Sequence, residues 1–135
     1  MCSSNSRPIR IVFLFLLATW LASPLPAGLI RDVDDFQQRL TLAVNRGKEA
    51  VATLVAARLA YIKCVGSGAR KSKEIRRRDD FIEDVVVVWR QPRRVVRVIP
   101  FDGNVIFHVR IGSRIFEFTV GKNDGKLQVV KELGC

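Results

Sequence analysis

The sequence predicts an α+β domain, in which a long or kinked helix, or a helix pair, packs on one face of a four- to five-stranded antiparallel meander. Between residues 29 and 65, apolar residues recur at spacings of three and four, which is the period of a helix. From residue 81 onward apolar and polar residues alternate, and short turn sequences separate the alternating segments. A chain of 135 residues, 48% of them hydrophobic, is long enough for one such domain with its own core.

Residues 1–27 have the layout of a secretory signal peptide. Arg7 and Arg10 precede the apolar run IVFLFLLATWLA, and SPLPAG then supplies helix breakers and small residues. The twelve residues of the run would span only about 18 Å as a helix, short of the roughly 30 Å hydrocarbon core of a bilayer. Cleavage after Ala27 would leave a single secreted domain, residues 28–135. An uncleaved membrane anchor is the alternative.

The cysteine count agrees with secretion. Cys2 is lost with the signal peptide, and Cys64 and Cys135 then form an even pair in an oxidising compartment. We therefore expect one disulfide that ties the end of a helix to the chain terminus, or else a dimer linked through Cys135. Two distant thiols and a single histidine are too few ligands for a metal site, so neither a metal nor a cofactor is expected.

The helical region, residues 29–65, divides at the Asn-Arg-Gly sequence that ends at Gly47. Three aspartates near its start lie where carboxylates stabilise a helix N-terminus. The second part carries Arg58 as the only charge in its middle, so we expect it to be a central core helix. The apolar positions of the first part are Leu29, Val33, Phe36, Leu40 and Val44.

Residues 66–80 are expected to form a mobile basic loop. Within it ARKSKE, residues 69–74, has the X-B-B-X-B-X order associated with heparin-binding segments. A solvated loop without a ligand is the alternative, because basic patterns arise often in a chain this basic. GSGARKS is not a phosphate-binding loop, since its spacing is wrong and no predicted strand precedes it. The candidate polyanion-binding residues of this loop are Arg70, Lys71, Lys73, Arg76, Arg77 and Arg78.

Residues 81–135 are expected to form the sheet. The turn sequences QP, DG, GS and KNDG suit hairpins, so all neighbouring strands should be antiparallel. In hairpin register the apolar residues share one face, which should pack on the helices. The candidate strands are 84–90, 94–101, 104–111, 114–121 and 126–133. The predicted inner pairs are Val85 with Val98, Val87 with Val96, Val98 with Phe107, Val96 with Val109, Val109 with Phe116, Phe107 with Phe118, Val105 with Val120, Val120 with Leu127 and Phe118 with Val129.

The opposite, outer face of the predicted sheet is a candidate binding surface. It carries an apolar strip bordered by arginines, which is typical of a surface that meets a partner. Arg97, His108 and Glu117 fall in one cross-strand row, which is either a small polar site or a ladder of surface charges. Arg93, Arg94 and Arg97 are the second group of candidate polyanion-binding residues. The predicted outer-face residues are Val86, Val88, Val95, Arg97, Ile99, Ile106, His108, Arg110, Ile115, Glu117, Thr119, Gln128, Val130 and Glu132.

One long helical element followed by an antiparallel meander in a small secreted chain resembles the cystatin fold in outline. Protease-inhibiting cystatins carry a Gln-x-Val-x-Gly hairpin and a Pro-Trp loop. This chain has no such hairpin, and Trp89 precedes Gln91-Pro92 in a different context. The resemblance therefore implies a fold outline, and by itself it does not imply protease inhibition.

The net charge predicts anionic partners. The whole chain has 23 basic and 13 acidic residues, and loss of Arg7 and Arg10 leaves 21 against 13, or +8. We therefore expect a secreted, extracellular cationic protein that binds anionic glycans, lipopolysaccharide or membrane surfaces in host defence, rather than nucleic acid. The alternative is a secreted, cystatin-like inhibitor or effector that binds an extracellular protein through the outer sheet face. Either would be a monomer or a weak dimer.

Enzymatic activity is not expected, because the chain has one histidine, no Ser/His/Asp spacing and no Gly-rich cofactor turn. The one catalytic alternative is a hydrolase that uses only the carboxylates Asp79, Asp80, Glu83 and Asp84. These acids more simply counter the arginines before them and protect the first strand from edge-to-edge pairing.

Overall fold

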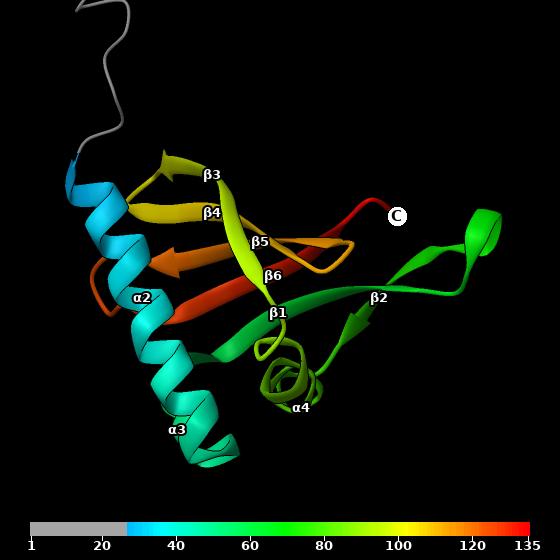
Figure 1. Cartoon of the computed structure of the whole chain (residues 1–135), viewed down its shortest axis with the longest axis horizontal. Helices are drawn as coiled ribbons and strands as arrows, with labels where there is room; N and C mark the ends of the chain where they lie inside the picture. The colour runs from blue at the N-terminus through cyan, green and yellow to red at the C-terminus, as the bar shows by residue number, and fades with distance from the viewer. Residues whose placement is uncertain (1–26) are drawn as a thin grey trace, which may run out of the picture.

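The computed structural model describes residues 27–135, which form a six-stranded mixed sheet with three helices on one face (Figure 1). The helices are α2 (Ala27–Arg46), α3 (Lys48–Thr53) and α4 (Arg78–Val88), with a short 3-10 helix η2 (Gly68–Arg70). The strands are β1 (Val55–Val65), β2 (Ser72–Arg76), β3 (Arg93–Phe101), β4 (Asn104–Ile111), β5 (Arg114–Gly121) and β6 (Leu127–Leu133). Their order is β2-β1-β6-β5-β4-β3, and the β1–β6 pair is parallel.

The predicted α+β class is confirmed, but the expected strand count of four to five is wrong, because the sheet has six strands. The parallel pair means that the sheet is not a simple meander, and the cystatin-like outline is not confirmed. The signal-peptide prediction falls, apart from Ala27, outside the described residues. None of the helices within residues 27–135 is long and apolar enough to cross a membrane.

Helix α2 has the predicted apolar spacing, but it begins at Ala27, so the three aspartates lie beyond its first turn and not at its N-terminus as expected. Val33, Phe36 and Leu40 lie on one side of the helix and are almost fully buried. The helix ends at Arg46, because Gly47 has φ of 118°, a conformation that residues with side chains rarely adopt. Helix α3 then begins directly, so the predicted interruption of the helical region is confirmed.

The predicted core helix after Gly47 is wrong in its second half, which is strand β1. Helix α3 stops at Thr53, and an extended strand runs on from Val55. Tyr61 lies opposite Val130 in the parallel pair with β6, while β2 pairs with β1 on its other side. An inner strand needs few charges, and a short apolar run fits a buried strand as well as a buried helix.

The predicted first strand, 84–90, is also wrong, because residues 78–88 form helix α4. Asp79 and Asp80 occupy its first turn, where carboxylates favour a helix. A carboxylate oxygen of Asp80 accepts a hydrogen bond from the backbone N–H of Arg77 at 3.2 Å, as in a capping box. These acids therefore start a helix, where we expected them to protect the edge of a strand.

The four consecutive valines made the helical spacing of the apolar residues in α4 hard to recognise in the sequence. Phe81, Val85 and Trp89 are spaced by four residues, and all three are buried. Val87 points to solvent with 68% of its surface exposed, so the predicted strand pairs of Val85 and Val87 do not form.

The expected mobile loop, residues 66–80, is for the most part an ordered arm. Strand β2 pairs antiparallel with β1, with Ile75 opposite Ile62 and Lys73 opposite Cys64. Helix η2 forms the bend at the tip. Figure 1 shows this hairpin reaching away from the helices.

The hairpin turns at Asp102-Gly103 and Gly112-Ser113 close as predicted. Asp102, Gly103 and Gly112 all have positive φ, as two-residue hairpin turns require. The confirmed pairs are Val98 with Phe107, Val109 with Phe116, Phe107 with Phe118, Val105 with Val120 and Val120 with Leu127.

Two bulges change the predicted register, one at Val96 in β3 and one at Gln128 in β6. Each inserts one residue, so the side chains beyond it change face. The corrected pairs are Val95 with Val109 and Val130 with Phe118, in place of Val96 with Val109 and Phe118 with Val129. Three of the predicted outer-face residues, Val95, Val130 and Glu132, lie on the inner side, and Val86 and Val88 belong to α4. The prediction is correct for Arg97, Ile99, Ile106, His108, Arg110, Ile115, Glu117 and Thr119, which lie on the outer face.

Trp89 lies at the centre of the core, directly after α4. Its ring stacks on Phe118 of β5 with centroids 5.8 Å apart. Its indole N–H donates a hydrogen bond to the Thr41 hydroxyl of α2 at 3.0 Å. One side chain thus connects both long helices to the sheet.

Cys64 and Cys135 form a disulfide pair with their Cα atoms 5.7 Å apart, as predicted. Cys64 belongs to strand β1 and not to the end of a helix. The link therefore ties the chain terminus beyond β6 to the strand that pairs with β6.

Replacing Val85 and Val87 individually with Ala distinguishes the observed helix from the predicted strand. Val85→Ala should lower the free energy of unfolding by about 2 kcal/mol, because it removes buried methyl groups. Val87→Ala should change it by less than about 0.5 kcal/mol. Urea denaturation of both variants is the measurement, and equal losses would contradict the helix.

Replacing Cys135 with Ser should lower the free energy of unfolding by about 4 kcal/mol, since the disulfide closes a loop with a sequence separation of 71. Cys64→Ser should cost about as much. Urea denaturation with and without reductant measures the loss, and a covalent dimer on a non-reducing gel would instead show intermolecular pairing.

Candidate functional site

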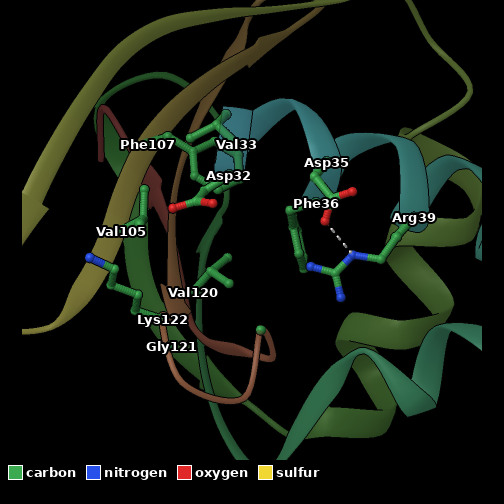
Figure 2. A pocket seen from close by; sticks show the side chains of 11 residues that line it. Asp32, Val33, Asp35, Phe36, Arg39, Val105, Phe107, Val120, Gly121 and Lys122 are labelled. Atoms are coloured by element: carbon green, nitrogen blue, oxygen red, sulfur yellow. Dashed lines mark ion pairs between the residues drawn. The ribbon is translucent and has the colours of Figure 1, made fainter. Parts of the chain in front are cut away.

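One cavity lies between α2 and the sheet, near the β5–β6 turn, and has a volume of about 70 Å³ (Figure 2). Phe36 and Phe107 form part of its wall. The ion pair of Asp35 and Arg39, at 3.1 Å, lies on one side of the opening and Lys122 on the other. The space holds a few water molecules and is too small for most organic substrates.

A second cavity lies between α4 and the sheet and measures only about 20 Å³, room for one water molecule. Asp84 of α4 lines it and accepts hydrogen bonds from the Tyr61 hydroxyl at 2.9 Å and from Lys63 Nζ at 2.7 Å. These three side chains join α4 to strand β1.

A second polar group lies nearby at the ends of β5 and β6. Arg114 binds Glu132 in a bidentate ion pair, with Nε to Oε1 at 2.6 Å and the second contact at 2.9 Å. Glu132 also accepts a hydrogen bond from the Cys64 backbone N–H at 3.1 Å. Glu132 is only 6% exposed, so its charge depends on these partners.

The hydrogen bonds in these two groups decide which side chains keep their charge. Burial by itself would raise the pKa of Asp84, but the hydrogen bonds from Lys63 and Tyr61 lower it below its usual range. Burial likewise opposes the ionised form of Glu132, and Arg114 and the Cys64 N–H together lower its pKa. Burial and the neighbouring Asp84 both raise the pKa of Tyr61, so the phenol stays protonated. Each group is thus held in one protonation state near neutral pH.

The four carboxylates of the catalytic alternative do not surround one cavity. Asp84 lines the second cavity, whereas Asp79 and Glu83 line an open groove beside α3. Asp80 caps the start of α4. Of the four, only Asp79 and Glu83 share a groove, and Glu83 there binds Lys48 Nζ at 3.2 Å.

The candidate residues at the hairpin tip, Arg70, Lys71 and Lys73, are all exposed and adjacent in the chain. Glu74 is the only acid of the arm, and Arg76 binds it at 2.9 Å. The three tip cations make no ion pair with any described residue. They are therefore open to an external anion.

The next two arginines of the predicted site have internal partners. Arg77 Nε lies 3.7 Å from Asp80 of the same helix start. Arg78 donates three hydrogen bonds to backbone carbonyls, those of Ala52, Val55 and Ala56, and so supports the passage from α3 to β1.

Arg93 also has a structural role. Its guanidinium lies 4.4 Å from the Trp89 ring and donates hydrogen bonds to the Thr41 hydroxyl at 2.7 Å and to the Trp89 carbonyl at 3.2 Å. Burial lowers its pKa from the usual arginine range. Arg94 and Arg97, by contrast, are exposed.

The predicted cross-strand row is confirmed: Arg97 lies opposite His108, and His108 lies opposite Glu117. His108 Nε2 and Glu117 Oε2 are 2.9 Å apart. Lys131 extends the row on β6. The row thus places the acid Glu117 between His108 and Lys131, with Arg97 on the far side of His108.

The two predicted groups of polyanion-binding residues do not form one patch. The tip group belongs to the arm formed with β2 and the other to β3, and these strands are opposite edges of the sheet. The sequence analysis placed Arg110 on the outer face correctly, but it missed that the β3 bulge sets Arg110 opposite Arg94. The one sign of the Arg94–Arg110 pair in the sequence is that this part of the chain has more arginines than acids to pair with them.

Comparison with known proteins gives no family. No family model and no curated protein matches the chain. A design from "An enumerative algorithm for de novo design of proteins with diverse pocket structures" has 14% identity and a TM-score of 0.43, over 76% of this chain and 96% of its own. A crystal structure from Kribbella flavida DSM 17836, provisionally described as a ketosteroid isomerase, has 14% identity and a TM-score of 0.41, over 76% of both chains. Likenesses this remote carry no information on ligand or activity.

Replacing Glu132 with Gln should lower the free energy of unfolding by about 2 kcal/mol at pH 7, because the charged hydrogen bonds to Arg114 are weakened. The native pKa of Glu132 is lowered, so its contribution is complete above the unfolded value of about 4.3 and is lost as pH falls through the native value. The deficit of the variant should therefore shrink below about pH 4.

Urea denaturation at several pH values measures this deficit, with Glu49→Gln at an exposed position as the control. A deficit that stays constant down to pH 2 would contradict the assigned role of Glu132.

Proposed function

We propose that this chain is a secreted cationic binding protein whose ligands are extended anionic surfaces, namely anionic glycans, lipopolysaccharide or membrane surfaces. The observation that carries the proposal is the hairpin tip, where Arg70, Lys71 and Lys73 are exposed without an acidic partner among the described residues. Clustered cations on a projecting arm can reach several phosphate or sulfate groups at once.

The distribution of charge across the molecule supports the same conclusion. Residues 27–135 carry a net charge of +8, with 21 basic and 13 acidic residues. Several acids are already paired with cations inside the fold, as Asp84 is with Lys63 and Glu132 is with Arg114. The uncompensated charge is therefore mostly cationic and lies at the surface.

The small size of the two core cavities also favours binding at the surface. They measure about 70 and 20 Å³, below the roughly 300 Å³ of typical small-molecule sites. Aromatic side chains, among them Phe107, Phe118 and Trp89, fill the space between the helices and the sheet. We therefore expect the ligand to bind at the surface of the domain.

The secreted protein should be retained on heparin and lipid A resins well above physiological salt, because a clustered site resists screening. The triple variant Arg70→Ser, Lys71→Ser, Lys73→Ser should elute at markedly lower salt. A salt gradient on each resin measures the shift.

A triple variant at scattered exposed cations, Arg31→Ser, Arg46→Ser, Arg58→Ser, has the same net charge and is the matched control. It should elute close to the wild type. The proposal fails if the wild type elutes below about 0.2 M salt or if both variants shift equally.

A further inference from the structure

The outer face of the sheet has no cover among the described residues. All three helices contribute buried side chains to the single core on the inner face. The outer side chains of β3 to β6 are then shielded mainly by one another. They include two largely aliphatic cross-strand rows: Ile99, Ile106, Thr119 and Val129 in one, and Ile115 and Leu133 in the other.

Three arginines stand beside these rows without an acidic partner. Arg94 and Arg110 lie directly opposite each other on neighbouring strands, and both are exposed. Arg97 follows on the same face. Like charges in directly opposite positions destabilise a sheet, and a bound anion would remove that cost. Guanidinium groups bind phosphate through paired hydrogen bonds.

The charge of this face argues against a second copy of the chain as its occupant. The strand residues that face outward on β3 to β6 include three arginines and Lys131 but only Glu117 as an acid. Glu117 is already bound to His108 at 2.9 Å. Two such faces would repel each other, so the occupant should be anionic.

The apolar content of the face indicates that this occupant is also amphiphilic. Phe101, at the β3 end of the same face, has 65% of its surface exposed. Ile99 and Ile106 lie next to it on the outer face, and Val96 is 41% exposed at the bulge. Aromatic and aliphatic side chains beside arginines match the boundary between lipid headgroups and acyl chains.

We propose that the outer face docks on an anionic lipid bilayer, with Arg94, Arg97 and Arg110 bound to headgroup phosphates and Phe101 inserted at the acyl boundary. This rests on the proposed function, of which it names one ligand and the face that binds it. The basic hairpin tip lies on the opposite edge strand, so it remains available to a second anionic ligand.

The test is sedimentation of the secreted protein with vesicles of phosphatidylcholine alone and of phosphatidylcholine with phosphatidylglycerol. The wild type should bind only the anionic vesicles. The triple variant Arg94→Gln, Arg97→Gln, Arg110→Gln should bind them about 100-fold more weakly, at roughly fivefold per arginine. Phe101→Ser should also weaken binding. All four positions are exposed, and circular dichroism checks that each variant folds.

The hairpin variant Arg70→Ser, Lys71→Ser, Lys73→Ser is the charge-matched control and should keep most of its vesicle binding while losing heparin retention. Equal loss of vesicle binding in both triple variants would overturn the docking face. So would a result in which the wild type captures an acidic protein but binds no vesicle. An unchanged Phe101→Ser variant would overturn insertion of the ring. If the wild type binds heparin but no vesicle, this inference fails and the proposed function stands; if it binds neither, both fail.

Discussion

The position of Trp89 determines how the helices meet the sheet. Its ring is almost fully buried and stacks on Phe118, its N–H donates a hydrogen bond to Thr41 of α2, and the Arg93 guanidinium lies 4.4 Å from the ring centroid. A large indole with a satisfied N–H is stable in this position because burial and hydrogen bonding act together. Trp89 directly follows α4, and β3 begins four residues later at Arg93, so this anchored residue lies between the last helix and the edge strand.

The charged residues form two groups: those that have a partner inside the fold and those that do not. Asp84 and Glu132 are ionised inside because Lys63, Tyr61 and Arg114 hold them. Arg78 and Arg93 bind backbone carbonyls and a hydroxyl. These groups stabilise the structure and are not free for a ligand, since releasing them would leave buried polar groups unpaired. The cations that we propose for binding, at the hairpin tip and on the outer sheet face, make no ion pair with a described acid.

These two surfaces differ in the kind of anion they suit. The tip is cationic and projecting, and among the described residues the only large apolar side chain exposed close to it is Ile75 of β2. The outer face is broad, mixes arginines with aliphatic rows, and carries one exposed aromatic ring at its edge. A hydrated polyanion gains nothing from an aliphatic row, whereas a lipid surface gains from both components. The two surfaces that we propose for binding therefore suit different kinds of anion.

Local chemistry in the sequence determined α2, the break at Gly47, the β3–β4 and β4–β5 hairpins and the disulfide pair, because each depends on nearby spacing, turn residues or cysteine count. The row of Arg97, His108 and Glu117 followed from the same turns. Only the tertiary structure decided that the valine run is a helix, that β1 is a strand beside β6, and that bulges turn Val95, Val130 and Glu132 inward. A short apolar run is compatible with either helix or strand, and the partner that covers it selects one of them. Only the tertiary structure showed that Arg78 and Arg93 have partners inside the fold, because the order of charges along the sequence does not reveal which residues will be in contact.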